Sequence, residues 1–507
     1  MTTTALKHLG STIRTVREER NMTQKELGKA IGTTQSAIAR MEQGEQNLST
    51  EMLSKISGAL NKEIIRIAAG EGMNLSIDGG RELHGSITVS TSKNGAVGLL
   101  CASLLNNGKT VLKRVPNIEE VHRIIEVLES IGVSVSRKGA DVEIVAPKNL
   151  SLRTMNRESA VRTRSVLMFI GPLLHRYDAF SIPQSGGCKL GSRSVRPHFF
   201  ALEKLGVDIQ TTSDYHEVRH IGLRPNTIVL YESGDTVTEN ALMGAAKIPG
   251  KTVIKYASAN YQVQELCYFL QKLGVKIDGI GTTTLTVHGV PEIDVDVEYE
   301  LSEDPTDAMF FIAAAIITNS SITIKRAPID FLELELLKLE KMGFKYELSK
   351  RYKARNGKTV LIDITTHPSD LTAAPDKIES RPYPGLNIDN LPFFAVIATQ
   401  AEGQTLIHDW VYEKRALYYT ELDKLGADTV LADPHRIFIT GKTRLKSAEL
   451  VCPPALRPAT IVLLGMLGAK GHSILRNVYS INRGYENLVN RLSTLGAKVK
   501  ILQEFTS

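Results

Sequence analysis

The chain has 507 residues, so we expect more than one domain, because single hydrophobic cores stop growing near roughly 250–300 residues. A hydrophobic content of 42%, a charged content of 23% and a net charge of +6 are typical of globular proteins and permit anion binding without making nucleic acid the default partner. The four cysteines are scattered, which argues against a disulfide framework or a zinc site and favours a reducing cytoplasm. No apolar stretch approaches the roughly 20 residues of a membrane helix, so no membrane partner is expected.

Residues 1–70 predict a small all-α domain. Thr23 and Glu26 form a capping box at the start of one helix, and Gly32 ends that helix. A second helix follows directly over residues 33–42. Two helices joined by a tight turn that contains glycine predict a helix-turn-helix arrangement, in which the second helix enters the major groove of DNA.

The runs 22–24, 31–36 and 40–44 resemble helix-turn-helix domains of the Cro and phage-repressor type. The resemblance implies contacts with bases and with phosphates by exposed polar side chains. The residues implied to face bases are Gln35, Ser36 and Arg40, and those implied to hold phosphates are Gln24, Gln43 and Asn47. DNA is therefore a predicted partner through residues 1–70, and a homodimer is the expected form because such domains usually act as dimers. A helical protein-interaction domain without DNA binding remains the alternative.

Beyond about residue 75 the chain repeats itself. A helix-ending signature of the type Leu-x-x-Leu-Gly recurs six times, with its glycines about 70 residues apart. The glycines are Gly132, Gly206, Gly274, Gly343, Gly426 and Gly496. Each unit also holds an apolar helix, such as residues 96–105 or 308–317, and several short strands. Because a wholly apolar helix is a buried one, each unit is expected to place one helix inside and one outside. Six units predict two lobes with a cleft between them.

A cysteine in a glycine-rich turn is the most reactive feature of the sequence. The run from Ser185 to Arg193 places Cys188 after two glycines and shortly before the cations of Lys189 and Arg193. Nearby cations and exposed backbone N–H groups lower the pKa of a thiol, and the thiolate is its reactive form. A buried structural cysteine beside a surface loop is the alternative interpretation.

The repeats and this turn together resemble the enolpyruvyl transferases. The motifs that carry the resemblance are Ser92-Lys93-Asn94-Gly95-Ala96, the run from Ser185 to Arg193, Thr238-Glu239-Asn240 and Asn482-Arg483-Gly484-Tyr485-Glu486. The family fold implies a two-lobed inside-out α/β barrel built of six repeats. In this chain the fold implies one lobe of residues 75–92 plus 304–507 and a second lobe of residues 93–303.

The resemblance implies transfer of an enolpyruvyl group from phosphoenolpyruvate to the 3-hydroxyl of UDP-N-acetylglucosamine, with release of phosphate. Cys188 is then the proton donor, Asp389 the base that takes the hydroxyl proton, and Lys93 a catalytic cation. The residues implied to bind substrate are Asn94, Arg164, Arg193, Arg415, Arg457 and Arg483, and Glu413 is implied to orient that region. No metal or organic cofactor is expected. Taken singly, an arginine such as Arg164 or Arg415 could equally lie in an ordinary ion pair, and Asp389 could cap a helix.

Some positions depart from the family pattern. Ala455 stands where the family commonly has an aspartate near the reacting centre, and Arg196 stands where an acid usually contacts uracil. Ile388 replaces a small hydroxyl residue beside Asp389, and the turn over residues 233–237 is altered. The phosphoenolpyruvate half of the motif set is therefore complete, whereas the acceptor half is changed. Two alternatives stay open: transfer to another nucleotide or sugar, and a transcriptional regulator with a metabolite-sensing, transferase-like domain.

Overall fold

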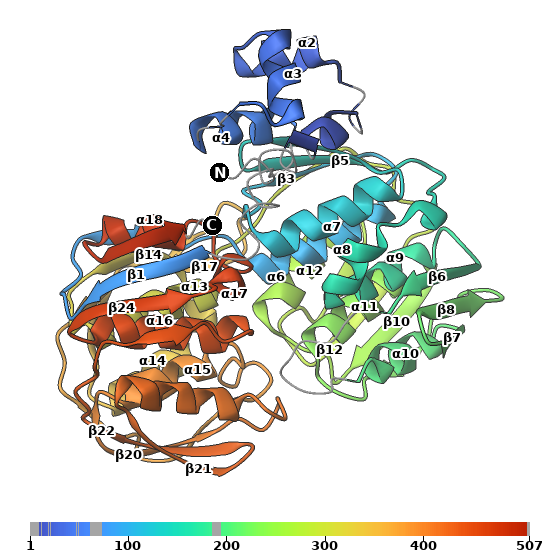
Figure 1. Cartoon of the computed structure of the whole chain (residues 1–507). Helices are drawn as coiled ribbons and strands as arrows, with labels where there is room; N and C mark the ends of the chain where they lie inside the picture. Colours follow the sequence, from blue (N-terminus) through green and yellow to red (C-terminus); the bar gives the residue numbers. More distant parts are fainter. Residues whose placement is uncertain are drawn as a thin grey trace.

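The computed structural model describes residues 10–11, 13–18, 20, 22–46, 48, 50–60, 73–184 and 194–503. Figure 1 shows a small helical unit beside two larger lobes, each of which contains both helices and sheet. Three separate clusters of buried hydrophobic side chains correspond to these parts. One cluster spans Ile13 to Leu60, one spans Ala96 to Leu301, and one combines residues 75–89 with residues 308–499.

The helical unit contains α2 (Gln24–Ile31), α3 (Gln35–Gln43) and α4 (Thr50–Ala59). The Thr23 hydroxyl accepts a hydrogen bond from the backbone N–H of Glu26, and the Glu26 carboxylate accepts one from the N–H of Thr23, which confirms the predicted capping box. Gly32 ends α2 with a φ of 74°, a conformation that glycine adopts without strain. Thr34 then caps α3 through its hydroxyl, so the two helices are set by their caps and the tight turn between them.

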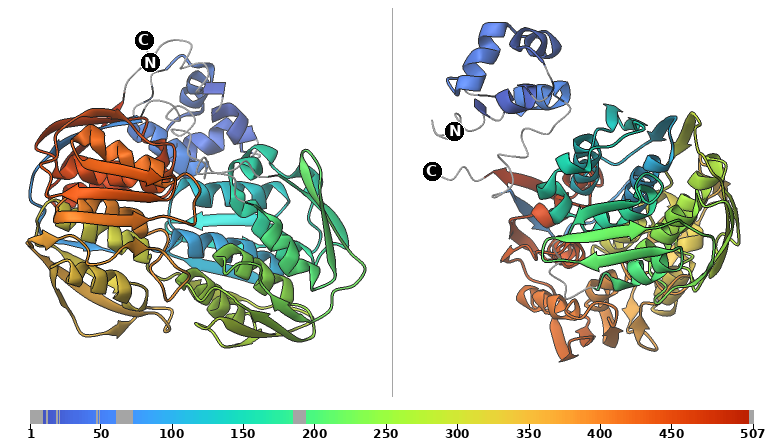
Figure 2. Two further views of the ribbon diagram at one scale, coloured as in Figure 1. Left: turned by 90° about the horizontal axis from the view of Figure 1, so that it is seen from below. Right: turned by 90° about the vertical axis from the view of Figure 1, so that its right-hand side faces the viewer.

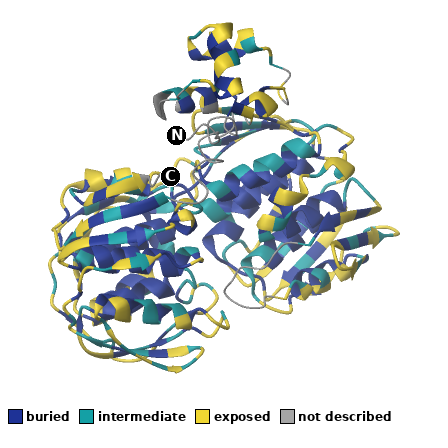
Figure 3. Cartoon of the chain, in the orientation of Figure 1, coloured by how far each residue is buried: buried dark blue, intermediate teal, exposed yellow. Residues whose placement is uncertain are grey.

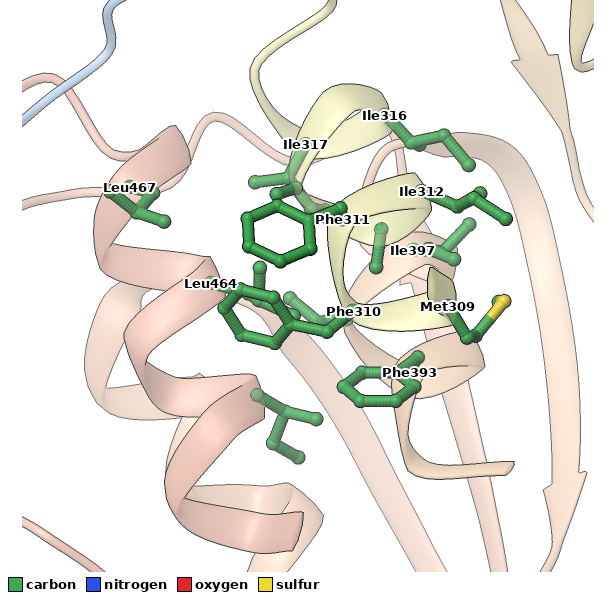
Figure 4. Close-up of a cluster of buried hydrophobic side chains, with 14 of the residues drawn as sticks. Met309, Phe310, Phe311, Ile312, Ile316, Ile317, Phe393, Ile397, Leu464 and Leu467 are labelled. Atoms are coloured by element: carbon green, nitrogen blue, oxygen red, sulfur yellow. The ribbon is translucent and has the colours of Figure 1, made fainter. Parts of the chain in front are cut away.

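The lobe drawn at the left in Figure 1, called lobe 1 below, has three helices at its centre. They are α13 (Pro305–Ile317), α15 (Leu391–Ala398) and α16 (Leu456–Gly468). Every residue of α13 and of α15 is buried, and the three helices pack against one another. Figure 4 shows their facing side chains, including Phe310, Phe393 and Leu464. Burying a side chain of this size contributes about 1.5–3 kcal/mol.

The outer layer of lobe 1 consists of sheets and further helices. In order of hydrogen-bonded neighbours, its first sheet is β23 (Glu449–Val451), β24 (Gly471–Arg476), β1 (Met73–Gly79) and β25 (Lys498–Gln503). Its second sheet is β15 (Lys345–Leu348), β17 (Val360–His367), β14 (Thr323–Pro328) and β2 (Ser86–Thr88), with β16 (Tyr352–Lys353) paired to β17. Its third sheet is β18 (Leu371–Thr372), β20 (Ala401–His408), β22 (Arg436–Gly441) and β21 (Asp428–Asp433), with β19 (Ile378–Glu379) paired to β20. Its further helices are η4 (Ile329–Phe331), α14 (Glu333–Lys341), η5 (Ala416–Leu425), α17 (Tyr479–Asn482) and α18 (Leu488–Thr494).

The other lobe, called lobe 2, repeats this plan. Its inner helices are α6 (Lys93–Ala102) with η1 (Ser103–Leu105), η3 (Arg164–Phe169) with α9 (Ile170–Leu173), and α11 (Asp235–Ala245). Its sheets are β13 (Val297–Glu300), β3 (Lys109–Lys113), β5 (Asp141–Val145) and β4 (Ser134–Lys138); β11 (Lys276–Asp278), β12 (Thr284–Gly289), β10 (Gly250–Lys255) and β9 (Thr227–Val229); and β6 (Ala179–Pro183), β8 (Tyr215–His220) and β7 (Val207–Thr211). Its other helices are α7 (Glu119–Ser130), η2 (Leu152–Thr154), α8 (Arg157–Arg162), α10 (Arg196–Glu203) and α12 (Tyr261–Lys272).

The repeat predicted from the glycines is present in the backbone. All six glycines have a φ between 86° and 98°, and each lies within three residues of the end of an outer helix. Five of the six sheets in the described part of the chain share a pattern as well, because a parallel edge strand such as β2 or β13 is followed by antiparallel neighbours. The sheet of β6, β8 and β7 has antiparallel pairs only. Each sheet is open, and the buried helices lie inside, as the dark blue colour of Figure 3 shows. The α/β fold class with inner helices is therefore confirmed.

The lobes lie side by side (Figure 2, left), and two chain segments cross between them. The crossings lie at residues 89–92 and 301–304, and they pair antiparallel through Thr91 and Glu303. The N–H of Ser92 donates to the carbonyl of Ser302, and the N–H of Asp304 donates to the carbonyl of Ser90, each at 2.8 Å. The helical unit lies outside both lobes, near β3 and β5 (Figure 1).

An ion pair joins this unit to lobe 2. The guanidinium of Arg20 lies 3.1 Å from the carboxylate of Glu129, at the end of α7. Both side chains are partly exposed, and a pair of this kind contributes about 0–1 kcal/mol. Within the described part of the chain, no helix has the length and apolar character needed to cross a lipid bilayer.

Glu265 on α12 makes the stability of lobe 2 depend on pH. Its side chain is buried, one oxygen accepts the N–H of Ser302 at 2.6 Å, and the other has no hydrogen-bonding partner among the described residues. Burial raises the pKa of Glu265 to about 8. The unfolded carboxyl group titrates near its ordinary value of roughly 4.3. Between these values the native state holds a proton that the unfolded state lacks, so stability falls as pH rises, by roughly 1.4 kcal/mol per pH unit.

Glu265→Gln removes this proton linkage while keeping the shape of the side chain. We expect the stability of the variant relative to the parent protein to increase as pH rises from 5 to 8, so that the variant is the more stable of the two at pH 8. Urea unfolding at pH 5, 6.5 and 8 measures the difference. Glu298→Gln, at an exposed carboxylate of β13, is the matched control. A stability difference that does not change with pH would contradict the prediction.

Candidate active site

Lys93 begins α6 at the boundary between the lobes. The hydroxyl of Ser92 caps the helix by accepting the N–H of Gly95 at 2.9 Å, so the predicted Ser-Lys-Asn-Gly motif forms a helix start and not an isolated turn. The Lys93 ammonium group lies close to several charged side chains. Burial lowers its pKa, the Glu120 carboxylate opposes this shift, and the cations of Arg483 and Arg457 add to it. Lys93 is thus a cation that burial destabilises, within a group of charged side chains.

Arg457 and Asp389 face this lysine from lobe 1. Arg457 lies in the first turn of α16, and its guanidinium is 3.1 Å from the Asp389 carboxylate. The same guanidinium donates to the hydroxyl of Tyr485 at 2.9 Å. Burial by itself would raise the pKa of Asp389, but Arg457, Arg415 and Lys93 lower it to about 2. Asp389 is therefore ionised at neutral pH. It does not cap α15, because Asn390 occupies that position.

Arg483 connects the two lobes. Its guanidinium lies 2.8 Å from the carboxylate of Glu120, which belongs to the first turn of α7 in lobe 2. Glu120 also accepts the hydroxyl of Thr163. Burial would raise the pKa of Glu120, yet Lys93 and Arg483 lower it to about 2. The sequence interpretation missed Glu120; an acidic residue in the first turn of a helix that follows a strand was the available signal.

Asp304 is a second acid that the sequence interpretation did not select. It caps α13 by accepting the N–H of Thr306 at 2.8 Å, and its other oxygen lies 3.4 Å from the backbone nitrogen of Lys93. The Asp-Pro pair at residues 304–305 is a recognisable helix start in sequence. A hollow between the lobes is lined by Asp304, Lys93, Arg457 and Tyr485.

Four of the inner helices begin near this hollow. Lys93 is in the first turn of α6, Arg457 is in that of α16, Asp389 immediately precedes α15, and Asp304 caps α13. A helix N-terminus presents unpaired N–H groups and a partial positive charge. Together with three cationic side chains, these helix starts form a site suited to an anion that carries more than one charge.

Three other predicted residues make their hydrogen bonds and ion pairs outside this cluster. The amide of Asn94 donates to the hydroxyl of Tyr261 at 3.0 Å, and Arg164 donates to the carbonyl of Ser194 at 2.8 Å. Arg415 is fully buried, and its guanidinium binds the carboxylate of Asp409 at 2.5 and 2.9 Å. Arg415 therefore lies in an ion pair, and it affects the site by lowering the pKa of Asp389. Its direct contact with substrate stays a prediction, as does the orienting role of Glu413, which is exposed.

Cys188 and Arg193 lie outside the described residues, as does the whole run from Ser185 to Arg193. The described chain resumes at Ser194, whose carbonyl binds Arg164. The predicted roles of Cys188 as proton donor and of Arg193 as an anion ligand remain predictions. No group of three or more metal-binding side chains occurs in the part of the chain that is described.

The residues predicted to read DNA are arranged on two helices. Gln35, Ser36 and Arg40 are all exposed on α3, and Gln43 is exposed at its end. Gln24 is half-buried, and its amide donates to the carboxylate of Glu42 at 2.9 Å. This carboxylate also holds the buried guanidinium of Arg17 at 2.5 Å, so Gln24 takes part in the packing of the unit. Asn47 lies outside the described residues.

Comparison with known proteins identifies both parts of the chain. The family model described as EPSP synthase (3-phosphoshikimate 1-carboxyvinyltransferase) matches residues 77–492. The chain belongs to this family of enolpyruvyl transferases. A second model, described as helix-turn-helix, matches residues 13–67. The family resemblance and the helix-turn-helix resemblance are therefore confirmed.

Curated relatives in this family cover most of the chain. The UDP-N-acetylglucosamine 1-carboxyvinyltransferase of Treponema denticola is 33% identical over 432 residues, which are 84% of this chain and 99% of the relative. The protein of that name from Borreliella burgdorferi is 32% identical over 431 residues, or 84% of this chain and 98% of its own. Among solved structures, the enolpyruvyl transferase NikO from Streptomyces tendae has the same fold, with a TM-score of 0.75, 23% identity and coverage of 86% and 100%.

We expect anion binding at this site to depend on the charge of Lys93. Its pKa is lowered, so the ammonium group is lost at a lower pH than an ordinary lysine, for which the value is roughly 10.4. Binding of inorganic phosphate should weaken as pH rises through this pKa. Calorimetric titration with phosphate between pH 7 and 10.5 measures the decline. Lys93→Arg keeps its charge over this range and should remove most of the pH dependence. An identical decline in Lys93→Arg would assign it to another group.

Proposed function

We propose that this enolpyruvyl transferase moves the enolpyruvyl group of phosphoenolpyruvate to the 3-hydroxyl of UDP-N-acetylglucosamine and releases phosphate. The cluster of Lys93, Arg457 and Arg483 at the meeting of the lobes is the observation that carries the proposal. Phosphoenolpyruvate has a phosphate and a carboxylate, and arginine forks and a lysine bind both kinds of group. The names of the curated relatives support the acceptor.

The charges of the site suggest how the proton steps are divided. Asp389 is ionised and can accept the proton of the acceptor hydroxyl, but its pKa of about 2 makes it a weak base while Arg457 is bound to it. When Arg457 turns to an anionic group of the substrate, Asp389 loses part of this stabilisation and its basicity rises. Cys188 would then protonate C3 of phosphoenolpyruvate while the hydroxyl oxygen bonds to C2. In a second step C3 gives a proton back to the Cys188 thiolate, the C2–C3 double bond forms again, and phosphate leaves from C2. Lys93 neutralises the phosphate as it departs.

A different acceptor is the second candidate. Arg196 is exposed at the first position of α10, in place of the acid that the family commonly has there. A cation at this place would favour an acceptor with more negative charge than a uracil ring presents. The buried Ala455, which leaves the start of α16 without a side-chain cap, motivates the remaining alternative. That alternative is a regulator that binds these metabolites with little turnover.

For the first part of the chain we propose sequence-specific DNA binding through α3. The helix-turn-helix match supports it, and Gln35, Ser36 and Arg40 form an exposed polar face suited to base edges. A homodimer is proposed as the DNA-binding form. We further propose a helix-turn-helix domain of residues 1–70, one lobe of residues 75–92 plus 304–507, another of residues 93–303, and a cytoplasmic location.

Release of phosphate tests the proposed reaction. On mixing phosphoenolpyruvate with UDP-N-acetylglucosamine we expect phosphate and a stable enolpyruvyl ether, detected by a phosphate assay and by mass spectrometry. Cys188→Ser should lower kcat by about 100-fold or more, because proton transfer by a positioned group contributes roughly 10²–10⁴. Cys452→Ser, at a buried thiol of lobe 1, is the control. No release with this acceptor but release with a more anionic nucleotide sugar would favour the second candidate.

Arg40→Ala tests the proposed DNA reader. Random-sequence selection with the full chain would first supply a binding site. We then expect Arg40→Ala to weaken binding by about 10-fold or more, since one good base contact contributes roughly 1–3 kcal/mol. Arg14→Ala, at an exposed arginine paired with Glu18 on the preceding helical segment, should bind as the parent does. Failure of the selection to enrich any sequence would overturn the assignment.

A further inference from the structure

The two chain segments that join the lobes form a small antiparallel ribbon. Residues 89–92 lead out of lobe 1 along β2, and residues 301–304 lead back from lobe 2 along β13. The ribbon is held by the two backbone hydrogen bonds between Ser92 and Ser302 and between Asp304 and Ser90. Any change in the angle between the lobes requires a change in the backbone conformation of these few residues.

Glu303 lies at the centre of this ribbon. Its side chain has no exposed surface, although the position is at the boundary of two lobes. One oxygen of its carboxylate lies 2.9 Å from the guanidinium of Arg114, which follows β3 in lobe 2. The same oxygen lies 2.7 Å from the guanidinium of Arg326, on β14 in lobe 1, whose Nε also donates to it at 2.8 Å. One buried carboxylate therefore binds a cation from each lobe.

The two arginines are held in equivalent ways. Each adopts a left-handed backbone conformation that is uncommon for a residue with a side chain, with a φ of 57° at Arg114 and 66° at Arg326. In each case the backbone N–H donates to an aspartate on the neighbouring strand, Asp141 for Arg114 and Asp363 for Arg326. Each lobe therefore places an arginine of the same backbone conformation against the ribbon.

The balance of charge at the boundary between the lobes depends on Glu303. Arg114 and Arg326 converge on one carboxylate oxygen, so without this carboxylate two cations would face each other across the boundary. Glu300 lies 3.4 Å from Arg114 and 3.6 Å from the exposed Arg355, and thus offsets part of this charge. Among the described ion pairs, Glu300 forms none with Arg326. Removing one member of a buried charge pair leaves the other charge uncompensated, which is strongly unfavourable.

We infer that Glu303 is a positioning residue that sets the angle between the lobes and so assembles the site. Its neighbour Asp304 accepts the backbone N–H of Lys93, and Arg457 lies on the opposite lobe. A ribbon that is fixed at Glu303 therefore also fixes Lys93 relative to Arg457. Glu303 touches no group that we place in contact with substrate. The contacts of Glu303 with Arg114 and Arg326, called the clamp below, do not depend on the proposed function. The inference that they assemble the site does rest on it.

Glu303→Gln is the variant that tests the clamp. It keeps the shape of the side chain and removes its charge, so attraction at the boundary becomes repulsion between Arg114 and Arg326. Hydrogen exchange of the full chain, measured without ligands, should become about 10-fold faster in peptides covering residues 88–94 and 299–306 and stay unchanged elsewhere. With phosphoenolpyruvate and UDP-N-acetylglucosamine, KM should rise about 10-fold and kcat should change less than about threefold, because fewer molecules hold the lobes in the binding arrangement.

Two further measurements separate an electrostatic clamp from a general loss of packing. Added KCl should reduce the ratio of KM between variant and parent, because salt screens repulsion between partly exposed cations. The double variant Glu303→Gln with Arg326→Met removes one of the two facing cations and should return exchange in both peptides toward that of the parent. Arg355→Gln, which removes the exposed cation beside Glu300, is the matched control and should leave exchange and KM unchanged.

The outcomes that overturn the inference are distinct from a failure of the proposed function. Exchange that stays slow in both ribbon peptides, exchange that rises over the whole chain, or a double variant that does not recover would each overturn the clamp. A parent protein without transferase activity would overturn the proposed function. The exchange measurements would still test whether Glu303 holds the two lobes together.

Discussion

Charge that is buried where the two lobes meet is the constraint on which the rest of this structure depends. Lys93 is supplied by lobe 2, and Arg457 and Arg483 are supplied by lobe 1. Desolvating such ions costs several kcal/mol each unless opposite charges are near. Glu120 and Asp389 provide those charges from opposite sides of the boundary. Arg483 of lobe 1 pairs with Glu120 of lobe 2, so the arrangement of the lobes and the state of the site are linked.

The fold meets this constraint by keeping the inner helices apolar. The side chains of α13 and α15 are buried along their whole length, and polar residues are placed at or just before the helix starts. Asp304 and Asp389 mark two of these starts, and Lys93 and Arg457 lie in the first turns of two others. Apolar interiors keep each lobe stable, while the helix starts collect charge on one side. The same repeat thus produces both the core and the site.

The sequence allowed the fold to be predicted because its signals are local. The glycine that follows each outer helix requires a positive φ, and the apolar inner helices require burial. Lys93, Asp389, Arg457 and Arg483 were selected through family motifs, and the structure brings these four into one electrostatic cluster. Glu120 was missed because its partner, Arg483, lies far along the chain and on the other lobe.

By itself, the sequence determined the order of the units, the helix caps, the apolar inner helices and the family to which the chain belongs. Each of these depends on neighbouring residues or on a motif that can be recognised in one stretch of chain. Only the tertiary structure decided which acids oppose which cations: Asp409 holds Arg415, Glu120 holds Arg483, and Glu303 holds Arg114 and Arg326. The physical reason is that an ion pair depends on distance and desolvation, which chain topology sets, and not on separation in sequence.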